Sequence, residues 1–399
     1  MQKFILVITT IVTLSFSDGY SQNRSIRFIE KPWQEIVAMA RKENKMIFLD
    51  AYASWCGPCK WMAAHMFTND TVADYFNSTF ICASIDMEKG EGTGLRKKYG
   101  VRAYPSLLFI DAGESMVHEK VGAPQRVNDY IEMAKVAQDP EECLSSYIKK
   151  YNAGNNSPQF IEKYLYRLAD AYIPVTNVMT TYFATQHETD LLSRQNWNII
   201  YRFVSDCNDP LFDFLVKHQQ EYAKRYTRDS VNNKVADIYL NSLRATWQSS
   251  SLKLADSAYR KMKEKVRTSG FAGAGKVIFT TDLQWFQMQG KDKEYLELAT
   301  QDLDKYYSDD YAKLINAAAT FLSIAKDNKY LEKAGEWAKK SISIKNVAYN
   351  NDIYASILFK LGKTKDAIRY EKEAIDIAKK MKEPSAQFEE SLKKMQEPK

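Results

Sequence analysis

A short apolar strand that runs directly into a pair of cysteines constrains this chain more than any other feature. Residues 45–54, KMIFLDAYAS, predict a buried strand, and residues 60–67 contain no helix breaker and predict a helix. Cys56 and Cys59 therefore lie where a strand ends and a helix begins. The free N–H groups and the dipole of a helix N-terminus stabilise a thiolate, which is a nucleophile near neutral pH.

Redox chemistry is the function that this cysteine spacing favours, and a metal site or two unrelated core thiols are the alternatives. One helical turn separates the two cysteines, so they can close a small disulfide ring. A structural zinc site needs a second ligand pair at suitable spacing, and the other cysteines stand alone, so we expect no metal. We predict that those three are buried free thiols, with a Cys143–Cys207 disulfide as the alternative. They are Cys82, Cys143 and Cys207.

Composition and the first residues indicate an exported protein. The chain has 399 residues, 45% hydrophobic and 27% charged, with a net charge of +6, which is typical of two or three soluble domains. The charges are interspersed, which argues against nucleic-acid binding. Residues 1–21 resemble a signal peptide, with Lys3 before an uncharged apolar run from Phe4 to Phe16. We expect a periplasmic or extracellular location, where disulfides persist. An uncleaved anchor is the alternative, but the run is shorter than the ~20 residues of a membrane span.

Residues 22–139 alternate between expected helices and strands and so predict a small α/β domain. A helix begins at Pro32-Trp33, and short helices are expected after Asn69, over 95–99 and over 125–137. Strands are expected over 46–52, 80–86, 106–111 and 115–121. Two strands joined by a helix imply a parallel βαβ unit, and the last two strands form a hairpin.

The residues from Trp55 to Lys60, WCGPCK, resemble the thioredoxin active site. Asp50 lies six residues before Cys56, where thioredoxins carry a buried acid, and Pro105 lies where the family has a cis-proline. The resemblance covers about residues 28–138 and implies a thioredoxin-like fold. The residues KMIFLD, with a preceding helix that contains Trp33, resemble exported thioredoxin-like proteins more than the cytosolic form. One position departs from the family, because counting back from Asp86 places Cys82 where a lysine often lies near the buried acid.

The resemblance implies dithiol exchange without a cofactor. Cys56 would be the exposed attacking thiolate and Cys59 the more buried resolving thiol. Asp50, with a pKa raised by burial, would accept the proton of Cys59, unless it only caps nearby backbone. The remaining residues implied are two that contact substrate, one cis-proline and three that support the cysteines. They are Trp55, Tyr104, Pro105, Gly57, Pro58 and Lys60.

Residues 140–309 and 310–399 predict two helical regions, because amphipathic helix-length segments replace short strands there. Ala334, Trp337 and Ile342 recur 33 residues later as alanine, tyrosine and isoleucine. This period is similar to a tetratricopeptide repeat, with a generic helical hairpin as the alternative. A phosphate-loop pattern that ends at Lys276 fails because Val277 stands where Ser or Thr should bind magnesium, so we expect no nucleotide.

Three functions are compatible with these features. The leading hypothesis is an exported thiol–disulfide oxidoreductase of the reductase or isomerase type, which acts on protein disulfides or thiols. It would need a second redox partner to recycle it, and no membrane contact is expected after signal cleavage. The alternatives are a helical scaffold with a thioredoxin-like docking domain and a metal-handling protein that uses Cys56 and Cys59.

Overall fold

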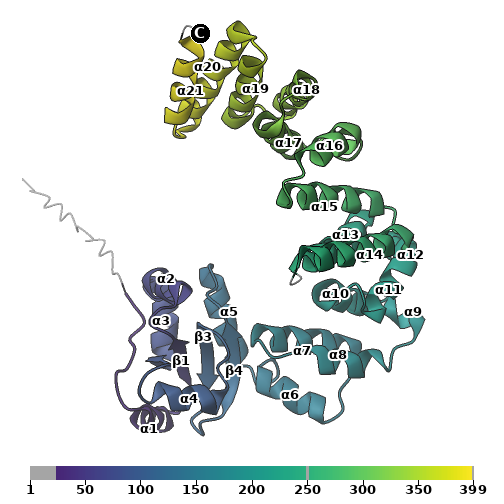
Figure 1. Ribbon diagram of the computed structural model, residues 1–399. Helices are drawn as coiled ribbons and strands as arrows, with labels where there is room; N and C mark the ends of the chain where they lie inside the picture. Colours follow the sequence, from purple (N-terminus) through teal and green to yellow (C-terminus); the bar gives the residue numbers. More distant parts are fainter. Residues whose placement is uncertain (1–23, 249–250, 398–399) are drawn as a thin grey trace, which may run out of the picture. The chain divides into compact units, whose positions relative to one another are not determined.

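The computed structural model describes residues 24–248 and 251–397, and Figure 1 shows their elements. The chain divides into two compact units, which meet in the sequence at Ile199 and Ile200. Within the described ranges, no helix combines the length and the apolar character needed to cross a membrane. The expected signal peptide, residues 1–21, lies outside the described residues.

The first unit is built on a four-stranded mixed sheet with the order β2-β1-β3-β4. The central strand β1 (Ile47–Tyr52) pairs in parallel with β2 (Ile81–Asp86) and antiparallel with β3 (Ser106–Ile110). The edge strand β4 (Met116–Val121) is the antiparallel hairpin partner of β3. All four strands lie within one residue of their expected bounds, so the predicted βαβ unit and hairpin are confirmed.

Helices cover both faces of this sheet, as Figure 1 shows. The face that carries Phe48 packs against α2 (Gly57–His65), α3 (Asp70–Thr79) and α5 (Val127–Gln138). The opposite face packs against α1 (Trp33–Glu43) and α4 (Gly92–Tyr99). The first face is an aromatic cluster, because side chains alternate along each strand and these strands place rings on one side. Its members include Phe48, Phe67, Phe76, Phe80, Phe109 and Tyr130.

Helix α4 begins earlier than the sequence predicts. The expected start was Leu95, after a glycine-rich loop, but the helix begins at Gly92. A Cβ atom at Gly92 would lie only 2.0 Å from the carbonyl oxygen of Asp86. Glycine therefore lets the first turn of α4 approach the end of β2, which sequence periodicity alone does not reveal.

The rest of the first unit is helical, and its first two helices, α6 and α7, pack against β4. The helices are α6 (Leu144–Asn152), α7 (Pro158–Asp170), α8 (Thr176–Phe183), α9 (Glu188–Leu191) and α10 (Arg194–Phe203), the last of which crosses the point of division. The breaks predicted near residues 154–158 and 173–174 separate α6 from α7 and α7 from α8.

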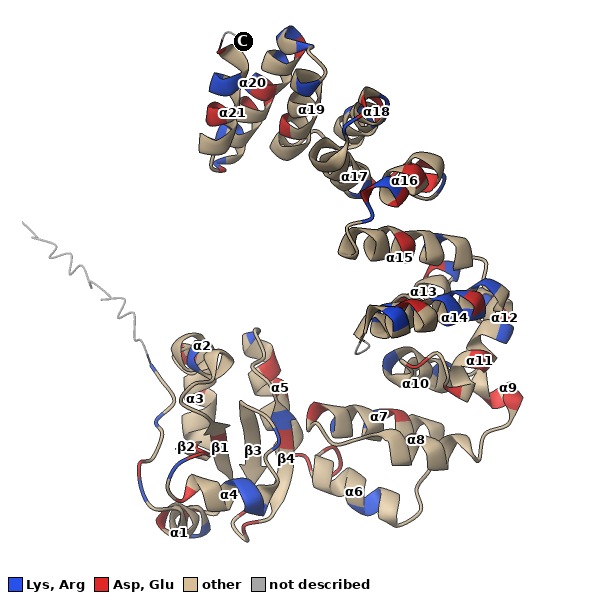
Figure 2. Ribbon diagram, viewed as in Figure 1, with Lys and Arg blue, Asp and Glu red and all other residues tan. Residues whose placement is uncertain are grey.

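The described part of the second unit is entirely helical, which confirms the predicted fold class, and basic and acidic residues are interspersed along its helices (Figure 2). One expected helix, residues 211–226, is interrupted at His218, whose ring stacks on Phe214 at 4.2 Å. The elements are α11 (Pro210–Lys217), α12 (Gln219–Arg225), α13 (Arg228–Ala245), η1 (Thr246–Gln248), α14 (Leu252–Thr268), α15 (Ala274–Met288), α16 (Asp292–Tyr307), α17 (Tyr311–Ile324), α18 (Asn328–Ile344), α19 (Ala348–Lys360), α20 (Thr364–Met381) and α21 (Ala386–Gln396).

The self-similar residues lie on corresponding helices of two consecutive helical hairpins. Ala334 and Trp337 are buried on α18, the second helix of the α17–α18 pair. Their counterpart Ala367 is buried on α20, the second helix of the α19–α20 pair. Gly362 lies in the turn between α19 and α20 with φ of +77°, a conformation that glycine adopts most readily. The tetratricopeptide assignment itself stays a prediction.

Candidate active site around the Cys56–Cys59 disulfide

The two cysteines of the motif lie at the N-terminus of α2 and are joined by a disulfide. Cys56 is the N-cap residue of α2, and Pro58 occupies the first turn, where the missing N–H costs no hydrogen bond. The Sγ of Cys56 accepts a hydrogen bond from the N–H of Cys59 over 3.1 Å. The helix N-terminus therefore directs an N–H group and its dipole at this sulfur, which favours a thiolate in the reduced form.

Both sulfur-bearing residues are enclosed in this disulfide state. Cys56 is 2% exposed and Cys59 is 5% exposed. The expectation of an exposed Cys56 beside a more buried Cys59 is therefore wrong here, because Tyr52 and Tyr104 pack against the pair.

Asp50 is a buried carboxyl group on β1. It shares a sheet face with Tyr52, which packs against the disulfide. Its Oδ2 accepts a hydrogen bond of 2.7 Å from the Ser84 hydroxyl, and its buried Oδ1 accepts none within the described structure. Burial raises the pKa of Asp50 to about 7, against the opposing effect of the Ser84 hydrogen bond. A carboxyl group with that pKa can exchange a proton near neutral pH.

The residue that contacts the buried acid is Ser84, while the alignment of Cys82 with the family's lysine stays a prediction. Ser84 lies directly opposite Asp50 in the parallel pairing of β1 with β2, whereas Cys82 lies opposite Phe48. The Cys82 thiol is buried in the aromatic cluster, where burial raises its pKa to about 12. Cys82 and Ser84 are two pairs apart along β2 and share a sheet face, and the pairing register places Ser84 opposite the acid.

Tyr104 and Pro105 lie directly before the start of β3, on another side of the site. The Tyr104–Pro105 peptide bond is cis, as the resemblance predicts. The carbonyl oxygen of Pro105 accepts a 2.8 Å hydrogen bond from the N–H of Gly122, which follows β4. The Tyr104 ring packs against the cysteine pair and meets the Trp55 ring edge-on at 6.0 Å.

Trp55 covers the open side of the site and is held by a residue that sequence reasoning missed. Its side chain is 68% exposed, and its indole N–H donates to Glu88 Oε2 over 2.8 Å. Arg96 lies 3.9 Å from the Glu88 carboxylate and 5.5 Å from the centroid of the Tyr104 ring. The sequence offers no local signal for Glu88, because it meets Trp55 only through the packing of the loop after β2.

The three residues expected to support the cysteines occupy the start of α2. Nothing lies within 4 Å of a Cβ built at Gly57, so the motif is open to a partner on that side. Pro58 shapes the first turn, and Lys60 is exposed on the helix. The described structure thus packs Tyr104 against the disulfide, with the Trp55 ring against Tyr104 and the cis-proline Pro105 next in the chain, while Asp50 shares a sheet face with Tyr52. The other cysteines are buried and free, as predicted, and a Cys143–Cys207 disulfide is absent from the described residues.

This mixed sheet, with a disulfide at a helix N-terminus beside a cis-proline, defines a thioredoxin-fold protein with a redox-active cysteine pair. The Thioredoxin family matches residues 25–135. Thioredoxin H4 of Arabidopsis thaliana is 41% identical over 91 residues, which are 23% of this chain and 71% of that protein. The chain therefore belongs to the thioredoxin family, through its thioredoxin domain.

Disulfide oxidoreductases are also similar to this domain. The thiol:disulfide interchange protein DsbD of Photorhabdus laumondii is 24% identical over 145 residues, which are 34% of this chain and 24% of that protein. A solution structure of a candidate disulphide-isomerase from Bacteroides thetaiotaomicron is 42% identical, with a TM-score of 0.28, and covers 30% of this chain and 98% of that one. The helices that follow the domain lie outside the family match.

Proposed function

We propose that this chain is an exported thiol–disulfide oxidoreductase that reduces or isomerises disulfides in protein substrates. The observation that carries the proposal is the Cys56–Cys59 disulfide at the N-terminus of α2, in a domain whose buried Asp50 has a raised pKa. Similarity to the thiol:disulfide interchange protein and to the thioredoxins supports the reaction class. The Gly-Pro pair between the cysteines favours reduction or isomerisation over strong oxidation.

The first step forms a mixed disulfide. In the reduced chain the Cys56 thiolate attacks one sulfur of the substrate disulfide, so a bond from Cys56 to substrate forms and the substrate S–S bond breaks. The second substrate sulfur leaves as a thiolate and takes a proton from solvent. The helix N-terminus assists this step because it stabilises the attacking thiolate.

The second step releases the substrate and needs a base. Cys59 gives its proton to the ionised Asp50 carboxylate and attacks the Cys56 sulfur. The Cys56–Cys59 bond forms and the reduced substrate leaves, so two electrons pass from the chain to the substrate. The dithiol of a second redox partner returns two electrons to the chain. Asp50 suits the role of base because its pKa of about 7 lets it take and release a proton near neutral pH.

The substrate face is formed by Trp55, Tyr104 and Pro105. Trp55 offers exposed apolar area, and the backbone at the cis-proline presents hydrogen-bonding groups to an extended substrate.

The signal-like residues 1–21 support the proposal of export, and mass spectrometry of the mature N-terminus tests it. A mature chain that begins after residue 21 is the expected result, and an intact N-terminus would contradict export by this route.

The reaction is tested by reduction of insulin with dithiothreitol as the electron source. The unsubstituted chain should accelerate reduction, and Cys56→Ser should abolish the acceleration because it removes the nucleophile. Cys207→Ser, which alters a buried thiol of the second unit, is the matched control and should retain activity. Undiminished activity in Cys56→Ser would overturn the proposal and would favour a docking role for the domain.

A further inference from the structure

A groove that the thioredoxin domain alone does not form lies between that domain and α7. Its cavity has a volume of about 530 Å³, within the range of ligand sites. We call it the α7 groove and define it by six lining residues. They are Val121, Gly122, Met133, Val136, Arg167 and Asp170. Val121 ends β4 and Gly122 follows it, the next two belong to α5 and the last two belong to α7.

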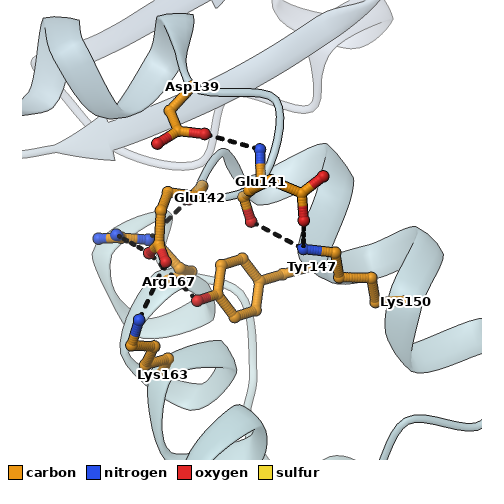
Figure 3. Close-up of polar contacts among 7 residues, drawn as sticks. All are labelled: Asp139, Glu141, Glu142, Tyr147, Lys150, Lys163 and Arg167. Atoms are coloured by element: carbon orange, nitrogen blue, oxygen red, sulfur yellow. Dashed lines mark hydrogen bonds and ion pairs between the residues drawn. The ribbon is translucent and has the colours of Figure 1, made fainter.

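Helix α7 is fixed in place by the carboxylate of Glu142, as Figure 3 shows. Lys163 and Arg167, one turn apart on α7, approach this carboxylate at 2.9 Å and 3.2 Å. Arg167 Nε also donates to the Glu142 carbonyl oxygen, and the Tyr147 hydroxyl of α6 donates to the carboxylate. Helices α6 and α7 therefore both contact Glu142, which lies in the segment after α5. These contacts fix the position of α7 beside the groove.

Two further contacts attach these helices directly to β4. Lys120 of β4 and Asp170 of α7 form an ion pair at 2.6 Å across the groove. His118 is buried on β4, and its Nδ1 accepts a hydrogen bond of 3.4 Å from the N–H of Leu144, at the start of α6. The edge strand of the sheet is thus covered by helices that the thioredoxin domain itself lacks, and the groove lies along this junction.

One hydrogen bond links the groove to the proposed substrate face. Gly122 lines it, and the Gly122 N–H donates to the carbonyl oxygen of Pro105. Nothing lies within 4 Å of a Cβ built at Gly122, so the backbone there is bare and open to a second polypeptide backbone. A substrate segment bound at the cis-proline would therefore lie next to a residue that lines the groove.

The lining matches a polypeptide with both apolar and charged side chains. Val121, Met133 and Val136 supply apolar area, while Lys120 and Asp170 form a charged rim. These two side chains are 32% and 35% exposed, and half-exposed ion pairs exchange partners at small cost. We infer that the α7 groove binds the polypeptide segment next to the disulfide of a protein substrate, and that α7 thereby selects substrates. This inference rests on the proposed function.

A kinetic comparison of a large and a small disulfide tests the inference. Val136→Trp fills the groove from α5, and Lys135→Trp places the same ring on the neighbouring exposed position as a control. We expect Val136→Trp to raise the KM for insulin roughly five- to tenfold, as loss of a contact cluster does, and to leave reduction of dithiobis-nitrobenzoate unchanged. An unchanged KM for insulin, or an equal loss for both disulfides, would overturn the inference.

Cross-linking tests the same inference without altering the groove. Full-length Cys59→Ser would be trapped as a mixed disulfide with a ten-residue cysteine peptide that carries benzoylphenylalanine four residues from its cysteine. Cross-links to α7 residues 163–170 are the expected result, and cross-links confined to residues 52–61 and 104–106 would contradict it. If the peptide forms no mixed disulfide at Cys56 at all, the proposed function fails as well, which separates the two failures.

Discussion

Asp50 links the stability of the thioredoxin domain to its chemistry. Its pKa is about 7 in the folded chain, above its ordinary value of 3.8, because burial disfavours the carboxylate. Between these two pH values the folded chain holds a proton that the unfolded chain releases. The free energy of unfolding therefore falls as pH rises from 3.8 to about 7, and the full penalty is present above pH 7.

Asp50→Asn should remove this penalty. We expect the variant to be more stable than the unsubstituted chain above pH 7, by at most about 4 kcal/mol, which is the shift from 3.8 to about 7 converted to free energy. Near pH 4 the two proteins should differ little. Urea unfolding at pH 8 and pH 4 measures both differences. A variant that is less stable at pH 8 would show that Asp50 is a structural cap.

Ser84 tunes this carboxyl group through its 2.7 Å hydrogen bond. Because the bond lowers the pKa of Asp50, Ser84→Ala should raise it, and the acid limb of the pH profile for mixed-disulfide resolution should move to higher pH. Ser84→Thr keeps a hydroxyl and should restore the profile. Single-turnover release of substrate, measured from pH 5 to pH 9, reports the shift. An acid limb that stays in place in Ser84→Ala would contradict this role.

The sequence predicted the chemistry-bearing residues at this scale but not their neighbours. Cys56 and Cys59 are recognised from their spacing at a strand–helix junction, and Asp50 and Pro105 from the family resemblance of their positions. Ser84 is not, because its meeting with Asp50 depends on the register between two strands, and a one-pair slip exchanges it for another residue. The burial of Cys56 was likewise missed, since it depends on tyrosines brought together by the fold.

At the scale of elements, β4 joins the thioredoxin domain to the helices that follow it. Burial and the neighbouring charges of Arg167 and Lys120 lower the pKa of His118 on this strand to about 3. The folded chain thus keeps His118 neutral, while the unfolded chain binds a proton below its ordinary pKa of 6.5. The free energy of unfolding should therefore fall on acidification below pH 6.5, by up to ~1.4 kcal/mol per pH unit.

His118→Asn should weaken this acid sensitivity because asparagine keeps an acceptor for Leu144 but does not titrate. We expect the loss of unfolding free energy between pH 7 and pH 4.5 to be smaller in His118→Asn than in the unsubstituted chain. His65→Asn is the control, since His65 is exposed on α2 and should leave the difference unchanged. Equal acid sensitivity in His118→Asn would show that other groups account for it.

The bounds of helices and strands could be predicted from the sequence where neighbouring residues determine them. The strands were predicted to within one residue by apolar runs and turn residues. The early start of α4 and the break at His218 were not, because the first depends on a close approach to Asp86 and the second has no Pro or Gly to mark it in the sequence. The position of α7 was also beyond sequence reasoning, since the contacts of Glu142 join residues 21 and 25 positions apart.

At the scale of the whole molecule, the chain combines a general redox domain with a long helical region. The thioredoxin domain at residues 25–135 supplies the dithiol chemistry that its family shares. The helices after residue 139 extend over both compact units, and α7 is the part that lines the α7 groove together with β4 and α5. The predicted boundaries at 139 and 309 stay predictions. On this account the chemistry is generic and the helices confer selectivity.

The most direct test asks which cysteine attacks. Reduced Cys59→Ser and Cys56→Ser would each be mixed with insulin, and the products would be located by peptide mass mapping under non-reducing conditions. The account predicts a stable mixed disulfide at Cys56 in Cys59→Ser and far less adduct at Cys59 in Cys56→Ser, because only Cys56 caps the helix N-terminus. An adduct that forms at Cys59 and not at Cys56 would contradict the account.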